Sequence, residues 1–127
     1  ISSPVVYFFY QNIQEEWKMY EKITAYTGLF SDAAASYAEL QKGIAAFGED
    51  FAQLGLMRED AMEVMGELVL ASKDALRQAA PTMSAERACA CIAVFLMMEP
   101  NLPGTMLDLI RQDVLPQILK RLQELDA

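Results

Sequence analysis

The chain has 127 residues, the length of one domain, and its hydrophobic fraction of 54% excludes an intrinsically disordered protein. Its net charge of −8 favours solubility, the default interpretation, or a basic partner, and it argues against binding of nucleic acid or an anionic membrane surface, because both of these are bound by clustered lysine and arginine. The most apolar stretch, residues 88–98, is about half of the roughly 20 residues that a membrane-spanning helix needs.

The first predicted helix covers residues 4–27. Its apolar residues recur at spacings of three and four, which is the helical period. These residues are Val6, Phe9, Ile13, Trp17, Tyr20 and Ile23. Pro4 is typical of a first helical turn, and Gly28 is typical of the residue that ends a helix. Four adjacent aromatic residues at positions 7–10 cover every side of such a helix, so some of them must contact another helix, subunit or domain.

The second predicted helix begins after Ser31, a favourable N-cap residue, and ends at Gly55. Apolar residues follow in an unbroken heptad pattern along it. They are Ala33, Tyr37, Leu40, Ile44, Phe47, Phe51 and Leu54. Gly43 and Gly48 lie beside this stripe, and their small size predicts the close approach of a neighbouring helix.

The third predicted helix covers residues 58–78 and repeats the same apolar spacing. Because only a short connection precedes it, we expect it to pack antiparallel to the second helix. After a break at residues 79–82, Ser84 is expected to cap a fourth helix that reaches Met98. This helix is apolar on all sides, which is typical of a central helix or of an interface.

Residues 99–104 contain two prolines and a glycine and predict a loop. The last helix is expected over residues 105–125. Pro116 removes one backbone hydrogen-bond donor, so we expect this helix to be kinked or split near Asp113.

Two groups of residues are candidate contacts for a partner or ligand. Aromatic side chains are enriched where proteins bind one another, and methionine adapts its shape to varied partners. The aromatic candidates are Tyr7, Phe8, Tyr10 and Trp17. The methionine candidates, which would line an apolar groove between the third, fourth and fifth helices, are Met62, Met65, Met97 and Met98. Ordinary core packing is the alternative interpretation for both groups.

The sequence offers no pattern typical of catalysis. It contains no histidine, the commonest general base and a frequent metal ligand. Cys89 and Cys91 point to different sides of one helix and cannot form a disulfide with each other, so we interpret them as small apolar residues of a reducing, cytoplasmic compartment. Adjacent carboxylates such as Glu49 and Asp50 do not face each other on a helix. We therefore predict no enzymatic activity, no metal site and no cofactor.

Residues 1–17, ISSPVVYFFYQNIQEEW in one-letter code, resemble the end of the DNA-recognition helix of tetracycline-repressor-type regulators. In that family an aromatic run is followed by a turn with a lysine and acidic residues, which opens the ligand-binding domain. Ile13 stands where the lysine is expected, and the acidic pair is displaced by one residue. The resemblance implies a regulatory domain that binds a small apolar ligand and lacks its DNA-binding helices.

A second resemblance is carried by residues 88–125. Residues 115–122, LPQILKRL, are similar to the start of the last helix of an armadillo or HEAT repeat. The resemblance implies a piece of a helical scaffold. Roughly three such repeats are needed to bury a continuous core, and the preceding residues do not supply them.

These observations predict an all-α fold, an antiparallel bundle of about five helices that forms a single domain over residues 1–127. Because the chain begins at Ile1 and not at methionine, we expect it to be part of a longer protein. The expected function is a non-enzymatic interaction or dimerisation domain that binds a protein partner, or a second copy of itself, through an apolar or aromatic face. A small apolar ligand and a helical scaffold remain the alternatives.

Overall fold

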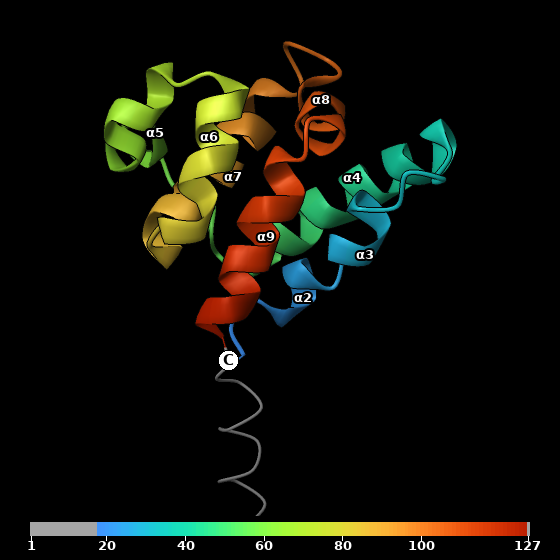
Figure 1. Ribbon diagram of the computed structural model, residues 1–127, viewed down its shortest axis with the longest axis horizontal. Helices are drawn as coiled ribbons and strands as arrows, with labels where there is room; N and C mark the ends of the chain where they lie inside the picture. The colour runs from blue at the N-terminus through green and yellow to red at the C-terminus, as the bar shows by residue number, and fades with distance from the viewer. Residues whose placement is uncertain (1–17, 127) are drawn as a thin grey trace, which may run out of the picture.

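The computed structural model describes residues 18–126, and over this range the chain is helical and contains no β-strand. The all-α fold class is confirmed, but the five long helices expected are divided into more and shorter elements (Figure 1). The elements are α2 (Glu21–Thr24), α3 (Thr27–Phe30), α4 (Tyr37–Gln53), α5 (Ala61–Met65), the 3-10 helix η1 (Gly66–Leu70), α6 (Lys73–Ala79), the 3-10 helix η2 (Ala80–Thr82), α7 (Ala85–Met98), α8 (Thr105–Arg111) and α9 (Val114–Leu125).

Helix α9 lies at the centre of the molecule, where it contacts α2, α3, α6, α7 and α8 (Figure 1). Its apolar side chains are buried against these neighbours, in agreement with the predicted buried side of the last helix. They are Val114, Leu115, Ile118, Leu119 and Leu122. The two ends of the described chain meet beside it, because the backbone N–H of Tyr20 donates to Asp126 Oδ2 at 2.8 Å.

Helix α7 is the element that matches the prediction most closely. Ser84 is its N-cap, and the Ser84 hydroxyl oxygen accepts a hydrogen bond from the backbone N–H of Arg87 at 3.2 Å. Residues 88–94 are all buried, so this stretch of the helix is covered on every side, as its uniformly apolar sequence predicts.

The start of α4 differs from the prediction. Ser31 follows the end of α3, and the N-cap of α4 is Ser36. Ser36 forms a capping box with Glu39: the backbone N–H of Glu39 donates to Ser36 Oγ at 3.1 Å, and Glu39 Oε2 accepts from the backbone N–H of Ser36 at 3.4 Å. Because the helix begins later, Ala33 and Tyr37 are exposed, and their assignment to the buried stripe was wrong.

The middle of the α4 stripe is buried as predicted, at Leu40, Ile44, Phe47 and Phe51, whereas Leu54 follows the end of the helix and is only partly buried. Helix α4 packs against α3. The Phe47 ring is fully buried and meets Phe30 edge-on, with 5.6 Å between ring centroids. The close approach predicted at Gly43 is confirmed, because a Cβ atom there would lie 2.5 Å from Leu29 Cδ2. At Gly48 a Cβ atom would make only ordinary contact with Leu96, at 3.4 Å.

The predicted first helix is interrupted in its described part. Helix α2 ends at Thr24, and Gly28, the predicted stop, lies inside α3. The hydroxyl of Thr27 donates to the carbonyl oxygen of Thr24 at 2.6 Å, a side-chain bond that competes with regular helical pairing. Residues 4–17 of this prediction lie outside the described range.

The predicted third helix is also divided. Gly66 has a φ of 61°, a left-handed conformation that ends α5, and Ser72 caps α6 by accepting from the backbone N–H of Ala75 at 3.1 Å. The buried residues Ala61 and Met65 lie on one side of α5, which packs mainly against α7 and not against α4. The expected antiparallel pairing of the second and third helices is therefore wrong for α5.

The predicted split of the last helix is confirmed. Asp113 has a φ of 61° and separates α8 from α9. Pro116 lies in the first turn of α9, where its missing N–H leaves no helical hydrogen bond unmade. The loop before α8 is also confirmed, and Glu99 Oε2 closes it by accepting from the backbone N–H of Gly104 at 2.8 Å. Over residues 18–126, no helix is long and apolar enough to cross a membrane.

Candidate functional site

Large apolar side chains are exposed at several places on the described part of the chain, and four of them fall in one stretch, residues 57–70, which comprises the connection before α5, α5 itself and η1. Leu70 is 93% exposed and Met62 is 56% exposed, while Met57 and Val69 are each exposed over more than a third of their surface. We call this stretch the 57–70 segment. Exposed apolar side chains that occur singly are ordinary on protein surfaces, but several in one short segment are typical of an interaction site.

The local geometry explains why these side chains are exposed. In the single turn of α5, Ala61 and Met65 are buried against α7, so the intervening Met62 and Glu63 lie on the outer sides of the helix. The turn at Gly66 then starts η1, which contains no fully buried residue. The short 3-10 helix therefore leaves Val69 and Leu70 in solvent.

Ion pairs attach the 57–70 segment to the body of the protein. The Arg87 guanidinium of α7 donates to both carboxylate oxygens of Glu67, at 3.1 Å and 3.2 Å. Arg58 pairs with Asp60 and reaches Glu86 Oε1 at 3.1 Å. Backbone hydrogen bonding and, after it, the charge of Arg87 hold the pKa of the Glu67 carboxyl below its ordinary value. These exposed pairs contribute little stability individually, but together they fix the position of the segment on α7.

The charge of the 57–70 segment is predominantly acidic. This stretch of sequence contains one basic residue, Arg58, and four carboxylates, and Arg58 is paired with one of them. The carboxylates are Glu59, Asp60, Glu63 and Glu67. Among the described residues, neither Glu59 nor Glu63 has an ion-pair partner, and both are exposed. The exposed apolar side chains thus lie in an acidic stretch of the chain.

The four candidate methionines do not share one groove. Met62 is exposed, and Met65, on the inner side of the same helix, is only 1% exposed and belongs to the core. Met97, at the end of α7, is 42% exposed, and Met98 beside it is partly buried against the core. The aromatic candidates Tyr7, Phe8, Tyr10 and Trp17 lie outside the described residues.

The exposure of Met57, Val69 and Leu70 was not predicted from the sequence. We expected one continuous helix over residues 58–78, in which the apolar residues form a buried side. A signal was present, however: the apolar run at residues 68–70 lies between Gly66 and Ser72, two residues that commonly border helices. A run of three apolar residues in so short a turn cannot all face one core.

Three hollows formed by described residues are open to solvent and have charged groups in their walls. One of about 610 Å³ lies between the end of α4 and the start of α7, with Arg58 and Glu86 in its wall and Cys89 beside them. Burial raises the pKa of the Cys89 thiol to about 12, and that of Cys91 to about 11. Both thiols are therefore protonated at neutral pH and are poor nucleophiles.

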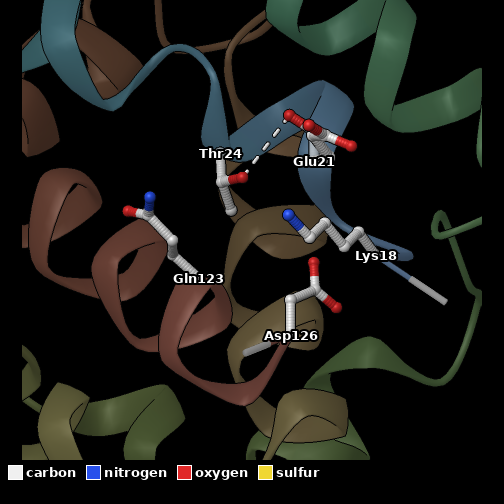
Figure 2. Close-up of a pocket in the computed structure, with 5 residues that line it drawn as sticks. All are labelled: Lys18, Glu21, Thr24, Gln123 and Asp126. Carbon is white, nitrogen blue, oxygen red and sulfur yellow. Dashed lines mark hydrogen bonds between the residues drawn. The ribbon is translucent and has the colours of Figure 1, made fainter. Parts of the chain in front are cut away.

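A second hollow, of about 250 Å³, lies between α2 and the end of α9. Figure 2 shows side chains of mixed charge around it: Lys18, Glu21 and Thr24 come from the start of the described chain, and Gln123 and Asp126 come from the end of α9. The Thr24 hydroxyl, a weak nucleophile unless a base activates it, donates to the carbonyl oxygen of Glu21 at 3.4 Å. This hollow offers polar contacts but no arrangement of a nucleophile and its base.

A third hollow, of about 390 Å³, lies where the connection between α3 and α4 meets the end of α8. Asp32, Arg111 and Asp113 contribute to its wall together with apolar residues. It differs from the enclosed apolar cavity expected of a site for a small apolar ligand. Within the range 18–126, no group of three or more cysteine, aspartate or glutamate side chains is placed to hold a metal ion.

No family model, no curated protein and no solved structure matches this chain. The function of this chain must therefore be inferred from its own residues, and the 57–70 segment is the surface with the clearest features of an interaction site.

Proposed function

We propose that this chain is a non-enzymatic helical interaction domain that binds a protein partner through the 57–70 segment. The observation that carries the proposal is the exposure of Leu70, at 93%, close in sequence to the exposed Met62. Burying a leucine or methionine side chain contributes about 1.5–3 kcal/mol. A partner that covers these two side chains gains this free energy of burial, because both side chains are exposed in the isolated domain.

The way the segment is held supports this proposal. Ala61 and Met65 anchor α5 in the core, and Arg87 fixes Glu67 at the start of η1. An interaction surface on a fixed support loses less conformational entropy on binding than a flexible one. The exposed side chains are thus presented to a partner in a defined arrangement.

The alternative function, binding of a small apolar ligand by a regulator of the tetracycline-repressor type, stays a prediction. Native mass spectrometry of the purified chain separates the two functions. We expect the mass of the polypeptide without a co-purified small molecule. A bound apolar molecule that remains on the folded protein would favour the ligand-binding alternative.

The interaction surface itself is tested by selecting displayed helical peptides on the purified protein. We expect the selected peptides to lose binding to the variant Met62→Ser/Leu70→Ser. The matched control is Met19→Ser/Leu102→Ser, which removes two apolar side chains that are each 57% exposed and lie outside the segment. Peptides that bind both variants equally well would contradict the proposed function.

A further inference from the structure

The acidic side chains of the 57–70 segment restrict the kind of partner that it can accept. Asp60 and Glu67 are neutralised by Arg58 and Arg87. Glu59 and Glu63, both exposed, have no ion-pair partner within the described part of the chain. Glu63 follows Met62 directly on α5, so an uncompensated carboxylate lies next to an exposed apolar side chain.

We propose that the partner of the 57–70 segment is a basic amphipathic helix of another protein. This inference rests on the proposed function, because it specifies the chemistry of the partner that the same segment binds. An amphipathic helix presents apolar side chains at spacings of three and four, which can cover Met62, Val69 and Leu70. Lysine or arginine on its flanks pairs with Glu59 and Glu63.

Charge complementarity distinguishes this partner from the other occupants of an apolar surface. A second copy of the chain would bring the same carboxylates face to face and would carry a net charge of −8 itself. An anionic membrane surface would be repelled in the same way. A basic helix gains binding energy from both the apolar and the acidic side chains of the segment. The two exposed methionines of the segment, Met57 and Met62, can adapt to the shape of this helix.

The experiment compares two synthetic peptides of about 18 residues, or about five helical turns, that share one leucine-rich face. One peptide carries lysine on its polar face and the other carries glutamate. Binding to the full chain is measured by fluorescence anisotropy at low and at high salt. We expect the basic peptide to bind at least about tenfold more tightly than the acidic one, and its affinity to fall as salt is added.

Variants of the protein locate the binding. Glu63→Lys is expected to lower the affinity of the basic peptide about fivefold and to raise the affinity of the acidic peptide. Glu49→Lys is the control, since it makes the same change of charge at an exposed position on α4. Leu70→Ser is expected to weaken both peptides. Circular dichroism of each variant verifies that the fold is retained.

The outcomes separate this inference from the proposed function. If both peptides bind equally well and both require Leu70, the partner is not selected by charge, and the interaction function stands without a basic helix. If neither peptide binds, or if binding does not depend on Leu70, both proposals fail. A dimer of the wild type in analytical ultracentrifugation that dissociates in Leu70→Ser would assign the segment to a second copy and overturn the basic partner.

Discussion

The core around α9 and the 57–70 segment contain the same kinds of apolar residue, but they use them in opposite ways. Leu115, Leu119 and Leu122 are at most 1% exposed on α9, whereas Leu70 is 93% exposed on η1. Residue type alone therefore does not decide burial. The neighbours of the element do, because α9 packs against α2, α3, α6, α7 and α8, whereas η1 packs chiefly against the adjoining α5.

The two regions also differ in how they are held. The core depends on close packing of buried side chains such as Phe30 and Phe47, against which the partly buried ring of Tyr26 packs. The 57–70 segment is held by two buried residues, Ala61 and Met65, by the partly buried Val64 and Leu68, and by exposed ion pairs such as that of Arg87 with Glu67. Stability should therefore respond strongly to changes in the core and weakly to changes in the segment.

The largest effect is expected from Phe47→Ala. The Phe47 side chain is fully buried, and its removal leaves a cavity among Tyr26, Phe30 and Phe51. We expect the free energy of unfolding to fall by about 3–5 kcal/mol, measured by urea denaturation. Tyr37→Ala on the same helix is the control, because Tyr37 is 61% exposed, and its effect should stay below about 1 kcal/mol. Equal losses in the two variants would contradict the described packing of α4.

A smaller effect is expected from Gly43→Ala. Alanine normally stabilises a helix by about 1 kcal/mol relative to glycine. At position 43, however, the new Cβ atom would lie 2.5 Å from Leu29 Cδ2 and 3.3 Å from Phe30 Cε1, so the Leu29 side chain must shift against its neighbours. We expect a net destabilisation of about 1 kcal/mol.

The matched control for this prediction is Gly48→Ala. Its Cβ atom meets Leu96 at an ordinary distance of 3.4 Å, and the helix should gain up to about 1 kcal/mol. Thermal melting of the two variants is expected to move in opposite directions. Stabilisation by both substitutions would show that α3 does not pack against α4 as closely as described.

The sequence predicted the elements that contain a long apolar pattern. Helix α7 and the buried part of α4 were found because their residues keep one period over several turns. The interruptions between helices were missed where a single polar residue determines at which position a helix begins. Ser31 and Ser36 are both possible N-caps, and only the reciprocal bonds of Ser36 with Glu39 distinguish them.

The candidate site was predicted in part for the same reason. Periodicity assigned residues 58–78 to one helix, so the exposure of Val69 and Leu70 was missed, although Gly66 and Ser72 border this apolar run. Met62 was predicted as a contact residue because of its type, and the structure places it on the surface. Exposure depends on how α5 meets α7, and a local sequence pattern does not contain that information.

Acid should weaken the attachment of the segment and leave the apolar core unaffected. The folded pKa of Glu67 is lower than its ordinary value, so its stabilising effect is present above an ordinary pKa of about 4.3 and is lost as the pH falls through the folded value. We expect Glu67→Gln to lower the melting temperature slightly near neutral pH, and the difference from the wild type to shrink as the pH falls through the lowered pKa of Glu67. A difference that grows as the pH falls would contradict the lowered pKa.

The smallest effect on stability is expected from Leu70→Ser, and this variant tests the comparison most directly. Leu70 contributes almost no burial in the isolated domain, so the free energy of unfolding should change by less than about 0.5 kcal/mol. Leu119→Ser, which replaces the same residue type in the core, should lower it by more than about 3 kcal/mol, because it adds a buried hydroxyl to a cavity. If urea denaturation gives Leu70→Ser a loss comparable to that of Leu119→Ser, Leu70 is part of the core in solution. The 57–70 segment would then have no exposed apolar anchor to offer a partner.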